Sequence, residues 1–250
     1  MASLKERVTE SLTEPTGSEV IHLRALRKAI GIVAVSLPFV LAIGENLRDW
    51  ILPHAAPADR TFVEGSISAY FHTGMREVFV GSLCAIAVFL VCYKGYQRRD
   101  NIAAKLAGIC ALLVALFPTQ ERSREASDTG VPVVDSATLF SSANAPDPAF
   151  VSWVHFTAAV IFFAVLAYMS YFLFTISTKA TPTPQKLQRN SIYRACGITI
   201  VLCIGVIAIG KFFLGDSVNQ TSYVFVFESI AVIVFGLSWL TKAEVILPDK

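Results

Sequence analysis

Six long apolar runs, separated by polar stretches, dominate this sequence. They cover approximately residues 28–46, 74–94, 102–118, 150–176, 195–214 and 222–241. A helix rises about 1.5 Å per residue, so about 20 apolar residues cross a hydrocarbon layer that is about 30 Å thick. The runs therefore predict an all-α fold, a polytopic membrane protein built as a bundle of six transmembrane helices.

The composition favours the same class of protein. Hydrophobic residues make up 54% of the chain and charged residues 16%, whereas soluble domains average roughly 45–50% apolar and about 25% charged residues. The net charge is only +2, and the basic residues stand in short groups beside the apolar runs. This pattern argues against nucleic acid as a partner and predicts membrane lipids as the surroundings.

The placement of Lys and Arg predicts the orientation. With six spans, most of the 21 basic residues fall on the side that carries both chain ends, and such residues accumulate on the cytoplasmic side. We therefore expect a cytoplasmic N-terminal tail over 1–27, a membrane domain over 28–241 and a cytoplasmic C-terminal tail over 242–250. The longest outer loop is expected at 119–149.

The third run carries a stripe of small residues. Ala103, Ala107, Ala111 and Ala115 recur every four residues, with Gly108 beside them. Small residues on one helix face let neighbouring backbones approach closely. The stripe predicts that this helix packs in the middle of the bundle.

Polar residues collect at the predicted outer ends of the runs. Ser68, His72 and Arg76 are spaced by four, which predicts one helical face leading into the second run. Ionisable groups in hydrocarbon cost at least about 2.5–3.5 kcal/mol, so they usually face the bundle interior. We expect a polar pocket open to the outside, to which other runs contribute Glu45, His155, Lys211 and Glu228.

Two interpretations of this pocket need no metal. In the structural one, Arg76 pairs with Glu77 or Glu228, and the histidines form hydrogen bonds at the interface. In the binding one, which we favour, the pocket takes a small molecule or a lipid headgroup. Arg76 and Lys211 then hold an anionic group, Glu228 balances charge or carries a proton, and the histidines respond to pH. The protein then serves as a transporter, a sensor or an accessory component.

A third interpretation is a metal site. His72 and His155, with a carboxylate from Glu45, Glu77 or Glu228, form a two-histidine, one-carboxylate set that suits zinc with one open position. The Ser68-x-x-x-His72 spacing, with Glu45-Asn46, resembles the alkaline ceramidase and adiponectin-receptor superfamily. That resemblance implies zinc in the bundle, hydrolysis of lipid amides or esters, and a water oriented by Ser68.

The sequence also departs from that superfamily. It has six apolar runs where the superfamily has seven helices, and it has no His-x-x-x-His near the C-terminus. A site with three histidines would need His54 to fold in from an outer loop. The overall layout is similar to that of poorly characterised bacterial six-helix membrane proteins, which implies a location in a bacterial inner membrane.

Overall fold

The computed structural model describes residues 17–51, 62–95, 97–119, 147–177, 181–215 and 221–248. Over these residues the chain forms six long helices and no strand, which confirms the all-α prediction. The helices are α2 (Gly17–Ile51), α3 (Arg76–Cys92), α4 (Arg98–Leu116), α5 (Pro148–Tyr168), α6 (Pro184–Leu214) and α7 (Tyr223–Lys242). A short 3-10 helix, η1 (Ser68–His72), precedes α3, and a π-helical turn, η2 (Met169–Leu173), continues α5.

Within the described ranges, four helical segments are long and apolar enough to cross a membrane. They are His22–Ile51, Ala149–Leu173, Pro184–Phe213 and Tyr223–Lys242. Their length and composition indicate a multi-pass membrane protein. The other two helices are shorter, with 17 residues in α3 and 19 in α4.

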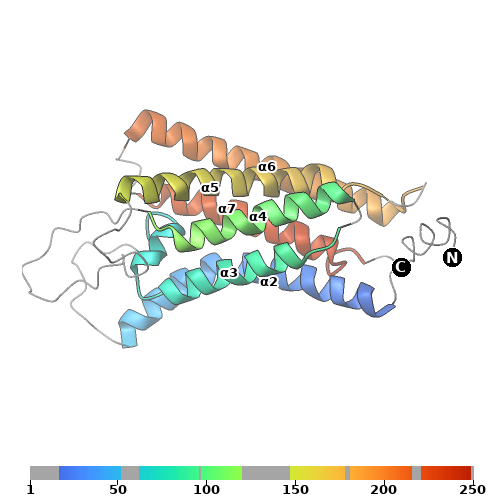
Figure 1. The fold of residues 1–250 in the computed structure, drawn as a ribbon, viewed down its shortest axis with the longest axis horizontal. Helices are drawn as coiled ribbons and strands as arrows, with labels where there is room; N and C mark the ends of the chain where they lie inside the picture. Colours follow the sequence, from blue (N-terminus) through green and yellow to red (C-terminus); the bar gives the residue numbers. More distant parts are fainter. Residues whose placement is uncertain are drawn as a thin grey trace, which may run out of the picture.

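Helices that follow one another in the sequence pack side by side and run in opposite directions (Figure 1). The last helix, α7, packs against α2 and closes the arrangement. The start of α2 and the end of α7 lie at one end, which we call the basic end after Arg27 and Lys242. The opposite end carries His72 and His155 and is called the histidine end.

The small residues of α4 face its neighbouring helices, but the prediction that α4 packs in the middle of the bundle is wrong, because Ile102, Leu106 and Ile109 on its other face are exposed. Ala107, Ala111 and Ala115 are fully buried, and α4 packs between α3 and α5. A Cβ atom on Gly108 would lie 2.8 Å from the carbonyl oxygen of Ala87 in α3. Only a residue without a side chain allows this approach of the two backbones.

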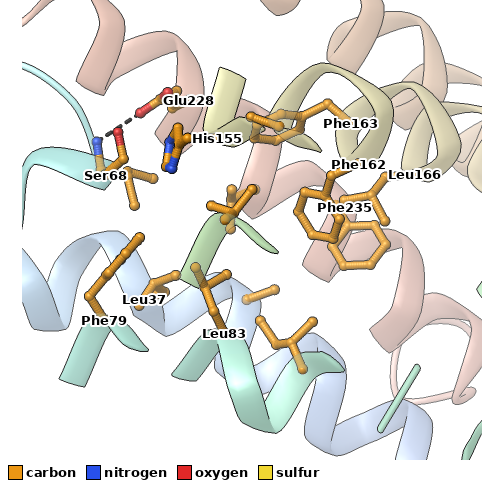
Figure 2. Close-up of a pocket in the computed structure, with 16 residues that line it drawn as sticks. Leu37, Ser68, Phe79, Leu83, His155, Phe162, Phe163, Leu166, Glu228 and Phe235 are labelled. Atoms are coloured by element: carbon orange, nitrogen blue, oxygen red, sulfur yellow. Dashed lines mark hydrogen bonds between the residues drawn. The ribbon is translucent and has the colours of Figure 1, made fainter. Parts of the chain in front are cut away.

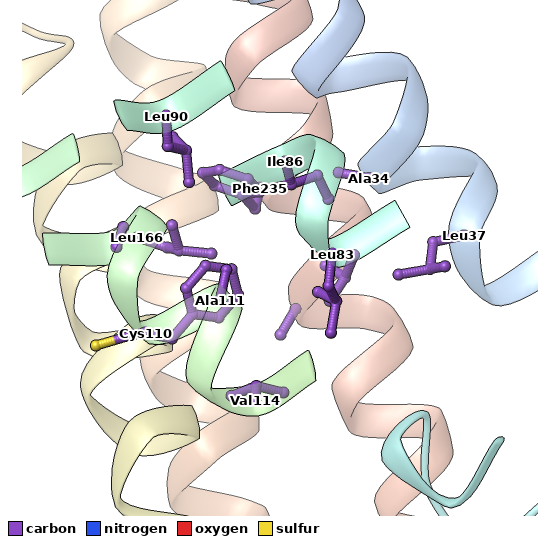
Figure 3. Close-up of a cluster of buried hydrophobic side chains, with 14 of the residues drawn as sticks. Ala34, Leu37, Leu83, Ile86, Leu90, Cys110, Ala111, Val114, Leu166 and Phe235 are labelled. Atoms are coloured by element: carbon purple, nitrogen blue, oxygen red, sulfur yellow. The ribbon is translucent and has the colours of Figure 1, made fainter. Parts of the chain in front are cut away.

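The apolar core runs along the middle of the bundle and draws on all six long helices that the structure describes; part of it is shown in Figure 3. α6 contributes Tyr193, Ile200 and Cys203 to this core. Its members include Leu37, Leu83, Ala111, Leu166 and Phe235. Each helix therefore buries one face, and α6 does so against α5, η2 and α7.

Two helices begin earlier than the apolar runs predict. α2 begins at Gly17 and α6 at Pro184, each eleven residues before the expected start of its run. For α6 the local signal is clear, because Pro184 occupies the first turn and the Thr183 side chain accepts a hydrogen bond from the Lys186 amide at 3.2 Å. Hydropathy locates the membrane-crossing part of a helix and misses its polar extension.

Candidate functional site

The opening segment of the predicted pocket is a 3-10 helix, and this corrects one prediction. η1 covers Ser68–His72, Thr73 is extended, and α3 begins only at Arg76. The Thr73 hydroxyl donates to the Tyr70 carbonyl and accepts from the Met75 amide, which fixes the break. A 3-10 helix has about three residues per turn, so positions four apart diverge. The prediction that Ser68, His72 and Arg76 share one helical face is therefore wrong.

A cavity lies between the helices near the histidine end (Figure 2). Its volume is about 50 Å³, measured as the space that the centre of a water-sized sphere can occupy. Its lining comes from α2, α3, α4, α5, α7 and the segment 67–68, and most of it is apolar. The polar lining residues are Ser68, His155 and Glu228, which lie together at one end, whereas Phe162, Leu166 and Phe235 line the other.

Glu228 connects α7 to the segment that precedes α3. Its Oε2 atom accepts a hydrogen bond from the Ile67 amide at 2.7 Å, shown dashed in Figure 2. One turn earlier, the Phe225 amide donates to the Gly65 carbonyl at 2.9 Å. The first turns of α7 thus hold residues 65–67 in place, and this brings Ser68 to the cavity.

Ser68 is buried at the cavity wall, where its hydroxyl lies next to the hydroxyl of Ser66. Its Oγ lies 3.1 Å from Oγ of Ser66. The Ser66 hydroxyl in turn accepts a hydrogen bond from the Ala69 amide at 3.0 Å. The hydroxyl of Ser68 is therefore held in position by the turn that begins η1.

The two histidines bind the backbone at the end of α4. His155 is only 3% exposed, and its Nδ1 lies 2.7 Å from the Phe117 carbonyl oxygen. Because a carbonyl only accepts, Nδ1 carries a proton. His72 Nε2 lies 2.8 Å from the Thr119 carbonyl oxygen. The histidines lie at the same end of the bundle, as expected, but His72 does not line the cavity.

The two cations of the predicted pocket point elsewhere. Arg76 lies over the Phe71 ring, with Cζ 4.3 Å from the ring centroid, and Lys211 lies over Phe156, with Nζ 4.4 Å from the centroid. These are cation–π contacts. Neither residue lines the cavity, and within the described ranges neither forms an ion pair with a carboxylate. The expected pairing of Arg76 with Glu77 or Glu228 is therefore not what the structure shows.

The residues suggested for zinc do not form a metal centre. Glu45 is buried on α2 and pairs with Arg48 at 3.6 Å. Among the residues that the structure describes, no group of three His, Cys, Asp or Glu side chains is placed to hold a metal ion. His72 and His155 instead bind backbone carbonyls, and His54 lies outside the described residues.

Sequence reasoning missed the apolar part of the site. An apolar side chain in an apolar helix carries no distinguishing signal by its residue type. A spacing signal exists, however: from His155 the lining of α5 continues at positions 4, 7, 8 and 11 residues further on, and from Glu228 that of α7 continues at 4 and 7. Such spacing marks one helix face. The polar residues therefore indicated the face, and with it Ala159, Phe162, Phe163, Leu166, Val232 and Phe235.

Comparisons of this chain with protein-family models, curated proteins and solved structures gave no match. What the site can do therefore follows from its chemistry. The apolar wall suits hydrocarbon, and the polar end offers a carboxylate, an imidazole and a hydroxyl. This is the usual composition of a small-molecule site, in which a few polar groups orient a largely apolar ligand.

Proposed function

We propose that this membrane protein binds a small amphipathic molecule in the cavity between its helices, as a sensor, a transporter or an accessory component. The observation that carries the proposal is the lining of the cavity, which is apolar along its length and polar at one end. The apolar chain of the ligand lies against the apolar lining, and Ser68, His155 and Glu228 bind its polar group. Ionisable residues within membrane spans commonly mark binding sites and pathways, which supports a binding role for this end of the cavity.

The polar end favours a ligand that donates hydrogen bonds. A carboxylate and the Nε2 atom of a neutral imidazole accept, and a serine hydroxyl can do both. Arg76 and Lys211, which were expected to hold an anion, contact aromatic rings instead of lining the cavity. The proposed ligand therefore carries a hydroxyl or an amine, and this replaces the anionic ligand expected from the sequence.

The size of the cavity limits the ligand. A single water-sized sphere needs roughly 10–15 Å³ by the same measure, so about 50 Å³ accommodates several such groups in a row. A chain of a few carbon atoms with one polar end fits without movement of the helices. We therefore place short alcohols and amines, or the head region of a lipid with such a group, ahead of larger ligands.

We further propose that all six helices cross the membrane. α2 ends and α5 begins at the histidine end, so α3 and α4 must run across and back between them. The 17 residues of α3 are about 25 Å long, close to the thickness of the hydrocarbon layer. With the basic end in the cytoplasm, the polar end of the cavity faces the outer side. A bacterial inner membrane fits this layout.

The test compares 1-hexanol, hexylamine and hexanoate as probes of the purified full chain in detergent. We expect the alcohol and the amine to raise the thermal unfolding midpoint more than the acid does. Glu228→Gln should lose the preference for the amine, whereas Glu77→Gln makes the same change at an exposed position and should behave as wild type.

A second variant tests the place of binding. Ala159 lines the cavity, so Ala159→Leu fills it and should abolish the response to all three probes. Partition of the probes into the micelle is the same for every variant and cancels in the comparison. Equal stabilisation of Ala159→Leu and the wild type would place the probes outside the cavity and refute the proposal.

A further inference from the structure

The basic end holds a cluster of cations that are buried instead of facing water. Arg27 is 7% exposed, Arg189 5% and Lys242 8%. Burial of a charged group is costly unless an opposite charge or several hydrogen bonds compensate it. We define the basic cluster as these three residues with Arg24 and Lys186, together with the carboxylates Asp100 and Glu244.

The loop after α7 ties part of the cluster together. Glu244 forms ion pairs with Arg24 of α2 and with Arg189 of α6, the latter at 3.8 Å. The Arg189 guanidinium also donates to the Leu247 carbonyl at 3.0 Å. On the same helix, the Lys186 ammonium donates to the Phe174 carbonyl at 2.7 Å. Glu244, just after α7, therefore holds cations from two helices that are distant in the sequence, α2 and α6.

Lys242 interacts electrostatically with four other members of the basic cluster. Lys186, Arg27 and Arg189 repel its charge, and Asp100 attracts it. Lys242 also contacts Arg27 through its backbone, because the Lys242 carbonyl accepts a hydrogen bond from the Arg27 guanidinium at 3.5 Å. Asp100 is also used elsewhere, because it caps α4 by accepting from the Gln97 amide at 3.1 Å.

Counted over the residues that the structure describes, the five cations of the basic cluster exceed its two carboxylates by three charges. The positive-inside rule accounts for basic residues on this side of a membrane, but it does not require them to be buried. Burial and convergence of cations from α2, α6 and α7 are instead typical of a site for an anion. An anion between them would relieve both their repulsion and their loss of hydration.

Aromatic rings form the apolar side of this region. Arg27 lies over the Tyr93 ring, Lys242 over Phe174, and Trp239 contacts both rings edge-on. Trp239 is fully buried, and its Nε1 atom has no hydrogen-bond partner among the described residues. A buried indole N–H is normally satisfied, so it is a further donor available to an oxygen atom.

We propose that the basic cluster binds a phosphate group. Phosphate oxygens are strong acceptors, and they match both guanidinium and ammonium donors. Basic pockets between transmembrane helices on the cytoplasmic side are suited to phospholipid headgroups, which carry this group. A soluble phosphate compound offers the same chemistry, and the experiment separates the two sources.

The test is a titration of the full-length protein in mild detergent, followed by native mass spectrometry. Phosphatidylglycerol is compared with diacylglycerol of the same acyl chains, and glycerol 1-phosphate is added as a soluble competitor. We expect phosphatidylglycerol to bind at least tenfold more tightly than diacylglycerol. Displacement of the lipid by glycerol 1-phosphate would support a soluble phosphate source, and retention would support the lipid headgroup.

The variants locate the site. Lys186→Gln with Arg189→Gln removes two charges of the basic cluster and should weaken phosphatidylglycerol binding about thirtyfold. Lys28→Gln with Arg99→Gln removes two exposed charges at the same end and should change it less than twofold. If the Arg189 variant does not fold, Lys186→Gln alone should weaken binding several-fold.

Two results would overturn the proposal. One is equal binding of phosphatidylglycerol and diacylglycerol together with no effect of glycerol 1-phosphate. The other is an equal loss in the two double variants, because that would mean attraction to the whole basic surface. Ala159→Leu fills the distant cavity and should leave phosphatidylglycerol binding unchanged, so the two proposals can fail separately.

Discussion

Gly31 of α2 and Gly236 of α7 bring their two helix backbones into contact. A Cβ atom on Gly236 would lie 2.8 Å from the Gly31 carbonyl oxygen, and one on Gly31 would lie 2.9 Å from the Gly236 carbonyl oxygen. Real Cβ atoms essentially never come within 3.0 Å of another heavy atom in this way. Since α7 closes the bundle against α2, this contact between small residues determines how tightly it closes.

We predict that Gly236→Ala lowers the free energy of unfolding by about 1–3 kcal/mol, because the added methyl group forces the two helices apart. The measurement is equilibrium unfolding in mixed micelles. Gly205→Ala is the matched control, because a Cβ atom there meets nothing within 4 Å. That variant should be neutral or gain up to about 1 kcal/mol from better helix propensity. Equal behaviour of the two variants would contradict the close contact.

The hydrogen bond from the Ile67 amide to Glu228 predicts a difference between two substitutions. Glu228→Ala leaves the Ile67 amide without this acceptor and should cost about 1–3 kcal/mol. Glu228→Gln keeps a carbonyl oxygen in reach and should cost less. Hydrogen exchange at the Ile67 amide should speed up in the alanine variant only. Faster exchange in both variants would show that the negative charge, and not the acceptor, is what holds this segment.

Ser170 of η2 and Ser238 of α7 form a buried pair whose direction is fixed. Their Oγ atoms are 3.0 Å apart, and the Ser238 hydroxyl also donates to the Phe235 carbonyl at 2.7 Å. Because Ser238 has one hydroxyl proton, Ser170 must donate to Ser238. The Ser170→Ala and Ser238→Ala variants should therefore show a coupling energy of about 0.6 kcal/mol in a double-mutant cycle.

Ser229 supplies the control for this pair. Its buried hydroxyl has no hydrogen-bond partner among the described residues, so Ser229→Ala removes a polar group without breaking a bond. We expect it to be neutral or stabilising when unfolding is measured in the same way. A coupling energy of zero between Ser170 and Ser238 would mean that the π-helical turn is held by packing alone.

The predicted orientation can be tested at two exposed positions on opposite ends. Arg99 lies in the first turn of α4 at the basic end, and Asp147 caps α5 at the histidine end. In a variant without the native cysteines, Asp147→Cys should react with a membrane-impermeant maleimide in intact cells. Arg99→Cys should react only after permeabilisation. The reverse pattern would place the basic end outside and the polar end of the cavity inside.

The apolar runs were enough to predict the helices, and the small-residue stripe marked the face of α4 that packs against its neighbours. Each run reports on its own chain segment, and the period of four in α4 defines one face without reference to other helices. The early start of α6 at Pro184 was also present in the sequence, in Thr183 and the proline that follows it. The eleven residues that open α2 mix polar and apolar types, and the Thr16-x-x-Glu19 spacing at their start is that of a capping box.

The positions of the polar residues along the bundle could be predicted from the sequence, but their partners could not. The sequence alone predicted Ser68, His155 and Glu228 at one end of the bundle, because each lies near the same predicted membrane surface. It could not assign partners, since Arg76 and Lys211 lie at the same end and yet contact Phe71 and Phe156. Which side chains share a cavity depends on the break at Thr73 and on the rotation of each helix about its axis. Those are set by packing between distant segments, and only the tertiary structure decided them.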